Sequence, residues 1–202
     1  MHRANIAQYT MLAVVISCML LAVGCWVPAL QPLYDNTNTV WDESLLGEWS
    51  SPDCTKLLPN ESKDCTLVFR RKPSANEYEL VLKDEGGVET TLLARLVRLG
   101  DTRFLDTYMS EYRKDLPVAY DMHTFPVHVF WRVQLEKNTL TLSRMSDTWL
   151  ENALKEGVVA PHQEVDDVIV LTGSTAELQK FFGKNAHNEP AFSRYPMRWT
   201  RK

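Results

Sequence analysis

The chain has 202 residues, of which 45% are hydrophobic and 24% are charged, and its formal net charge is −4. This length suits one domain with its own hydrophobic core. The acidic balance excludes the broad positive charge that nucleic-acid binding needs, so we expect no nucleic-acid partner.

Residues 1–24 have the pattern of a secretory signal peptide. Residues 1–10 contain Arg3 and no acidic residue, and residues 11–23 form an uncharged run of 13 residues. An apolar run of 7–15 residues after a positive start is typical of exported proteins. Because a bilayer-spanning helix needs about 20 apolar residues, this run is too short to cross a membrane.

The sequence Leu21-Ala22-Val23-Gly24-Cys25 ends this segment and resembles the lipobox of bacterial lipoproteins. The resemblance implies cleavage before Cys25, which then carries a diacylglycerol and an amine-linked acyl group such as palmitate. Several acyl chains would give durable membrane attachment. Trp26 stands where an aspartate would mark inner-membrane retention in enteric bacteria, which implies an outer-membrane protein facing the periplasm. Ordinary signal cleavage beside an incidental cysteine is the alternative.

Residues 25–44 are expected to be a lipidated anchor and an extended tether. The segment contains Pro28 and Pro32 and sustains no apolar period, which favours a spacer that holds the domain away from the bilayer. Alternatively, its apolar side chains pack on the domain or enter the membrane interface: Trp26, Leu30, Leu33 and Tyr34.

Cys54 and Cys65 are the cysteines that remain after Cys18 and Cys25. In an oxidising periplasm this even pair is expected to form a disulfide. The crosslink would contribute about 3 kcal/mol on the chain-entropy model. A metal site is less favoured because no Cys-x-x-Cys spacing or nearby histidine accompanies the pair, and we expect no metal or cofactor.

Residues 45–186 are expected to form an antiparallel β domain. Short runs rich in β-branched and aromatic residues alternate with turn residues, as in sequential hairpins. They predict a mainly β fold in which an eight-stranded meander makes a closed or open barrel; a β-sandwich is the alternative. The expected strands are 45–51, 65–72, 77–84, 88–99, 102–109, 127–136, 139–145 and 166–172.

Two short helices are expected at 147–156 and 175–183. Ser146 is placed to cap the first helix, and Ser174 with Glu177 has capping-box spacing for the second.

Gly47-Glu48-Trp49 is similar to the Gly-x-Trp of the first lipocalin strand. The resemblance implies a barrel that binds a small apolar ligand or lipid, with a helix after the eighth strand. It also implies an arginine over Trp49, for which Arg194 and Arg198 are the candidates.

The run 127–136 has the clearest period-two alternation. One face is expected in the core, because successive strand side chains point to opposite sides. The inward set is Val127, Val129, Trp131, Val133 and Leu135, packed with Trp49, Leu80, Leu82 and Leu142. The opposite face is expected in water at His128, Arg132 and Glu136.

Asp106 shares a strand face with Phe104 and Tyr108. If that face is interior, a buried carboxylate marks a site; the favoured alternative places Leu105 and Met109 inside and Asp106 in water. Residues 110–125 form a long connection, expected to be a lid or binding loop, or else an extra edge strand. Together with Trp131, the candidate ligand contacts are Asp106, Tyr108, Tyr112, Tyr120, Met122 and Phe125.

Residues 187–202 are expected to form a basic, aromatic tail. Its basic residues can contact an anionic lipid surface: Arg194, Arg198, Arg201 and Lys202. A solvated tail is the alternative. No nucleophile–base pair or metal motif is visible, so an enzyme is the least favoured class. The alternative to a ligand-binding lipoprotein is an accessory subunit of a cell-envelope complex.

Overall fold

The structure is a computed structural model. It describes residues 26–52, 64–72, 76–84, 87, 89–109, 126–158, 160–166, 168–192, 194 and 196–202.

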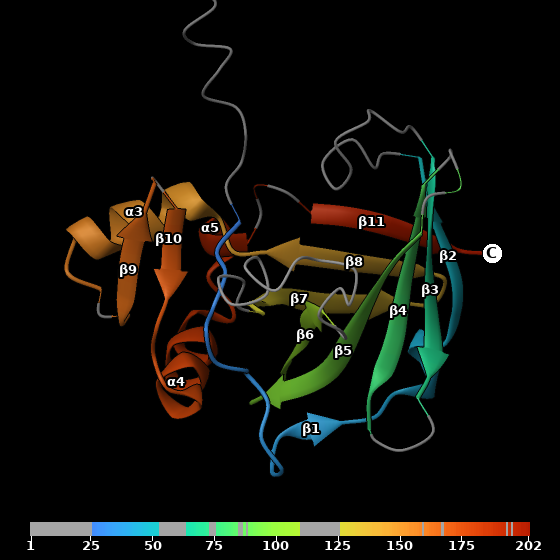
Figure 1. The fold of residues 1–202 in the computed structure, drawn as a ribbon, viewed down its shortest axis with the longest axis horizontal. Helices are drawn as coiled ribbons and strands as arrows, with labels where there is room; N and C mark the ends of the chain where they lie inside the picture. The colour runs from blue at the N-terminus through green and yellow to red at the C-terminus, as the bar shows by residue number, and fades with distance from the viewer. Residues whose placement is uncertain are drawn as a thin grey trace, which may run out of the picture.

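Eight antiparallel strands form a closed barrel (Figure 1). Consecutive strands pair as neighbours, and pairing of the last strand with the first closes the sheet. This confirms the predicted mainly β barrel and decides for a closed one. The strands are β2 (Gly47–Ser51), β3 (Cys65–Arg71), β4 (Tyr78–Asp84), β5 (Glu89–Leu99), β6 (Thr102–Met109), β7 (His128–Glu136), β8 (Thr139–Arg144) and β11 (Pro196–Arg201).

The eighth barrel strand differs from the one predicted. Residues 166–172 contribute β10 (Val168–Leu171), which pairs with β9 (His162–Val165) in a separate hairpin beside the barrel. Instead β11, from the expected tail, lies between β8 and β2. Its Met197 and Trp199 alternate into the barrel core, which is why this basic segment is stable as a strand. The helices therefore precede the eighth strand, unlike the order that the lipocalin resemblance implies.

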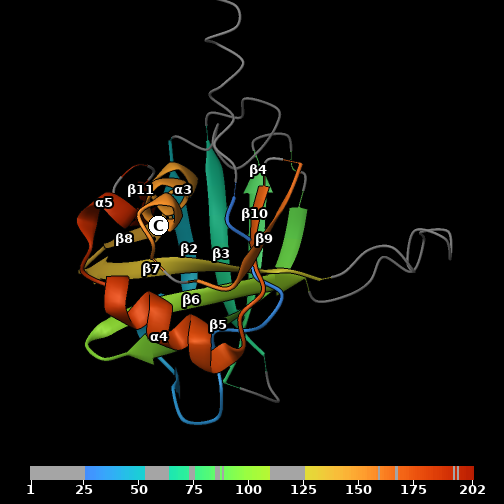
Figure 2. The same cartoon turned by 90° about the vertical axis from the view of Figure 1, so that its left-hand side faces the viewer.

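Three short helices in the described part of the chain cover one side of the barrel with the β9–β10 hairpin (Figure 2). They are α3 (Asp147–Lys155), α4 (Thr175–Asn185) and α5 (Glu189–Phe192). The first two confirm the predicted helices, and both predicted serine caps are present, the second as a capping box. An outer core fills the layer between them and the barrel. Phe104 and Phe130 of the barrel pack there against Phe182 of α4.

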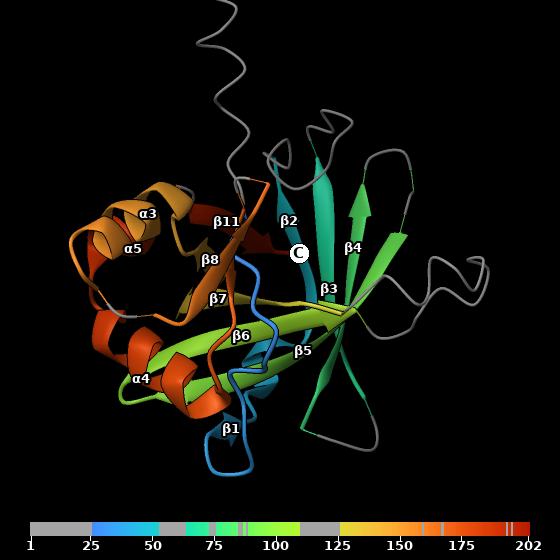
Figure 3. The ribbon, with the colours of Figure 1, turned by 60° about the vertical axis from the view of Figure 1, so that its left-hand side comes forward.

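Residues 26–40, here called the N-terminal strap, pack on the domain and are not an extended tether (Figure 3). The backbone of Ala29 pairs with His128 of β7 on one side and bridges Leu171 of β10 on the other. Leu33 is fully buried. The strap ends in β1 (Thr39–Val40), which pairs with β5. The structure thus agrees with the alternative prediction for this segment, in which Leu33 and its apolar neighbours pack on the domain.

One end of the barrel is closed by the 3₁₀ helix η2 (Glu43–Leu45) and by Trp49, whose Nε1 donates to the Leu45 carbonyl over 2.9 Å. An arginine lies over Trp49 as the lipocalin resemblance implies, but it is Arg201 and neither Arg194 nor Arg198. The Arg201 guanidinium is 4.2 Å from the Trp49 ring and donates to the carbonyls of Ser44 and Leu46.

The backbone conformation and surroundings of Gly47 explain why the Gly-x-Trp motif has a glycine at this position. Its φ of +111° suits glycine, and a Cβ there would lie 3.3 Å from Arg201 Nη1.

The predicted inward face is confirmed for the four residues that lie in β7, but Val127 precedes the strand and is 38% exposed. Val129, Trp131, Val133 and Leu135 belong to the inner core, together with Trp49, Leu80, Leu82 and Leu142. The prediction for the opposite face is wrong at two of three positions. Glu136 is exposed, but His128 is half-buried and Arg132 is buried. The strap covers His128, and Glu189 and Phe192 of α5 contact Arg132.

Candidate functional site: the barrel cavity

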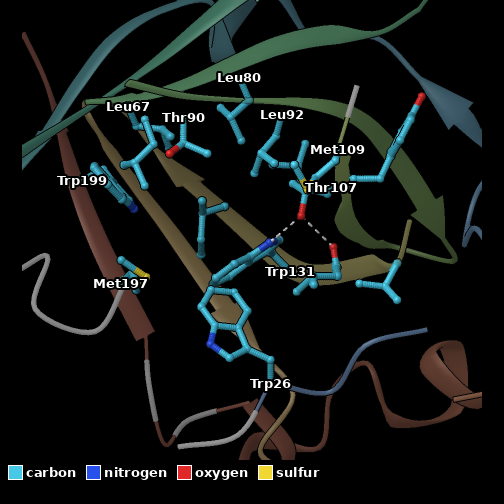
Figure 4. Close-up of a pocket in the computed structure, with 16 residues that line it drawn as sticks. Trp26, Leu67, Leu80, Thr90, Leu92, Thr107, Met109, Trp131, Met197 and Trp199 are labelled. Atoms are coloured by element: carbon cyan, nitrogen blue, oxygen red, sulfur yellow. Dashed lines mark hydrogen bonds between the residues drawn. The ribbon is translucent and has the colours of Figure 1, made fainter. Parts of the chain in front are cut away.

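A cavity of about 270 Å³ occupies the barrel at the end opposite η2 (Figure 4). It reaches the surface, because four of its lining residues are exposed. We call this opening the mouth. The lining residues come from seven barrel strands, the connections beside them and the strap: Trp26, Leu67, Leu80, Leu82, Thr90, Leu92, Leu105, Thr107, Tyr108, Met109, Val127, Val129, Trp131, Leu142, Met197 and Trp199.

The cavity wall is apolar with a few fixed polar groups, the usual composition of a small-molecule site. Trp131 Nε1 donates to Thr107 Oγ1 over 3.1 Å, and that hydroxyl donates to the Val129 carbonyl. These bonds hold the Trp131 ring in the wall. Trp199 Nε1 is buried, and no partner for it is found among the described residues. A buried donor without a partner is costly, and this N–H is not exposed to the cavity.

Trp26 lies at the edge of the mouth. Its ring meets that of Trp131 edge to face, with centroids 5.4 Å apart. The Arg144 guanidinium lies 5.1 Å from the centre of the Trp26 ring. Trp26 is 36% exposed although Trp131 and Arg144 contact its ring. The strap therefore brings the start of the described chain to the cavity.

Asp106 lies outside the barrel wall, under the strap. It is fully buried, so the favoured alternative, which placed Asp106 in water, is wrong at this residue although Leu105 does face the inner core. Asp106 Oδ2 accepts from the Leu33 amide over 2.7 Å, and Oδ1 lies 2.7 Å from His128 Nδ1. Burial raises the pKa of Asp106, and the His128 contact opposes that rise. The carboxyl group thus fixes the strap to β6 and β7.

Glu77 forms a second polar cluster on the outer face. It is 3% exposed and accepts hydrogen bonds from Tyr108 and Arg95, with Lys72 Nζ at 3.3 Å. Burial raises the pKa of Glu77, but its three partners outweigh burial and hold it below its ordinary value. Burial and the bond to Glu77 both raise the pKa of Tyr108. Arg95 also stacks over Tyr34 of the strap, 4.2 Å from its ring centre.

Some of the predicted site residues line the cavity, others lie elsewhere on the domain, and the rest fall outside the described part of the chain. Trp131 and Tyr108 line the cavity, whereas Asp106 does not. Arg201 closes the far end, Lys202 bonds to Thr66, and Arg198 lies on the exposed face of β11. Arg194 contacts Thr148 of α3. The remaining predicted residues lie outside the described part of the chain: Cys25, Cys54, Tyr112, Tyr120, Met122 and Phe125.

Met197 and Trp199 are cavity residues that sequence reasoning missed. The signal was present, because Met197, Trp199 and Arg201 alternate with polar residues at period two. The dense basic charge of this segment concealed that pattern. Trp26 was recognised as able to pack on the domain but not as a cavity residue.

The described residues contain neither a metal-ligand cluster nor a membrane-spanning helix. No group of three or more His, Cys, Asp or Glu side chains there is arranged to hold a metal ion. None of the helices found in those residues is long and apolar enough to cross a membrane.

Comparison with protein-family models, curated proteins and solved structures finds no match to this chain. The cavity must therefore be interpreted from its own chemistry.

Proposed function

We propose that this protein is a lipoprotein, anchored in the bacterial outer membrane through Cys25, whose barrel binds an acyl chain or a similar small apolar ligand in the periplasm. The observation that carries the proposal is the open apolar cavity of about 270 Å³. This volume is close to the lower limit of about 300 Å³ for ligand pockets, which favours a slender chain over a bulky ligand.

The Asp106–His128 pair is the arrangement closest to a catalytic group. A carboxylate can orient a histidine that activates a nucleophile. Among the described residues, however, no hydroxyl or thiol is bonded to the other ring nitrogen of His128, and the strap covers the pair. Its contacts support a structural role, namely fixing the strap.

Neighbouring residues of β5 provide a test of ligand binding. Thr90 and Thr91 are both exposed, but only Thr90 lines the cavity. Thr90→Trp should fill the mouth and weaken binding of a fluorescent fatty acid at least about tenfold, or about 1.4 kcal/mol. Thr91→Trp adds the same side chain to the other face and should leave affinity unchanged. If the unaltered protein does not bind the probe, or if both variants bind it equally, the proposal is wrong.

The anchor is tested separately with Cys25→Ala. This change should leave the protein unprocessed or release it from membranes, and it should abolish incorporation of a clickable fatty acid. Persistent label on the alanine variant would contradict the proposed anchor.

A further inference from the structure

The exposed apolar side chains of the described residues gather at the mouth. Trp26, Met109 and Val127 are 36%, 53% and 38% exposed, and all three line the cavity. They come from the strap, the end of β6 and the residue before β7. The fourth exposed large apolar residue, Val165, belongs to the β9–β10 hairpin. An exposed apolar rim around a cavity marks a contact with another apolar surface.

The chemistry of this rim suits a lipid bilayer. Tryptophan is favoured at membrane interfaces because its ring is apolar and its N–H is polar. Cys25 directly precedes Trp26 in the sequence. An acyl anchor on Cys25 would therefore enter the membrane beside the mouth.

We propose that the rim formed by Trp26, Met109 and Val127 lies against the bilayer, so that the cavity receives its acyl chain directly from the membrane. This inference rests on the function proposed for the same cavity. An acylated Cys25 would hold the mouth against the bilayer. The bilayer is therefore favoured over a protein as the partner of the rim. The opposite end of the barrel, with the hairpin turns at Gly100 and Lys137, then points away from the membrane.

Photolabelling of the membrane-associated full chain tests this orientation. The protein is bound to phosphatidylcholine vesicles containing a phospholipid with a diazirine in its acyl chain, and labelled peptides are mapped by mass spectrometry. Because a rim penetrates only about 5–10 Å into the interface, peptides with Met109 and Val127 should carry about tenfold more label than those with Gly100 or Lys137. Equal labelling at both ends, or failure to bind the vesicles, would overturn the orientation.

A charge placed at the rim provides the matched comparison. Val127→Asp should lower labelling of the rim several-fold. Gln134→Asp adds the same charge at an exposed position about 23 Å along the same strand and should not. Equal labelling of these two variants would overturn the inference.

A diazirine fatty acid in the same vesicles distinguishes this inference from the proposed function. It should label interior peptides such as the one with Leu80. Interior label without rim label would refute only the orientation, and rim label without interior label would refute only acyl-chain binding.

Discussion

Two tryptophans in the same barrel should respond differently to truncation. Trp49 is fully buried at the closed end, whereas Trp131 is 7% exposed and lines the cavity. A buried aromatic side chain removes about 150–250 Å² from water, which at about 25 cal/mol per Å² gives an upper estimate of about 4–6 kcal/mol. Measured losses for Trp→Ala in packed cores are about 3–5 kcal/mol because neighbours partly relax.

Trp49→Ala should lie at the upper end, about 5 kcal/mol, because the ring has packing on all sides and an Nε1 bond to Leu45. Trp131→Ala should cost about 3 kcal/mol, because the cavity side of its ring has no packed neighbours to lose. We therefore expect a difference of about 2 kcal/mol between the variants. Trp131→Ala should also enlarge the cavity and alter affinity for a fluorescent fatty acid.

Urea unfolding followed by far-ultraviolet circular dichroism measures both losses, and equal m values would show that the two variants unfold over the same surface. Equal destabilisation would mean that the cavity beside Trp131 is filled in solution. A loss under about 1 kcal/mol for Trp131→Ala would mean that its side chain is not part of the core.

Three further outcomes are expected. Cys54 and Cys65 should form a disulfide, so neither thiol in unfolded, unreduced protein should react with maleimide; reaction of both would contradict the bond. Glu77→Gln should destabilise the domain at neutral pH by about 2–4 kcal/mol. Because the pKa of Glu77 is held below 4.5 in the folded state, its stabilising effect is present above that pH and is lost as pH falls through the lowered pKa. The loss in the variant should therefore shrink in acid, and a pH-independent loss in chemical denaturation would refute the assignment. Arg201→Ala should cost about 1.5–3 kcal/mol by leaving two carbonyls without this donor, and Arg201→Lys should restore less than half of the loss in thermal unfolding, because an ammonium group cannot reproduce the guanidinium fork.

The sequence alone was sufficient for features that depend on neighbouring residues. The inward face of β7 followed from alternation, because a shift of one residue would have replaced Trp131 and Val133 in the barrel core with the polar Arg132 and its neighbours on the other face. The starts of α3 and α4 followed from Ser146 and Ser174, because a cap bonds to an amide three residues away. The predictions for Cys25 and for the disulfide also come from sequence and stay predictions.

Tertiary structure decided the features that depend on distant partners. The sequence predicted a strand at 166–172 and a tail at 187–202, and the pairing of Thr200 with Ser50 makes residues 196–201 the strand that closes the barrel instead. The sequence left Asp106 either buried or in water and favoured water, yet it is buried because Leu33, 73 residues earlier, brings the strap over it. The cavity likewise depends on how side chains from seven strands meet, since alternation fixes which of them point inward but not how completely they fill the space.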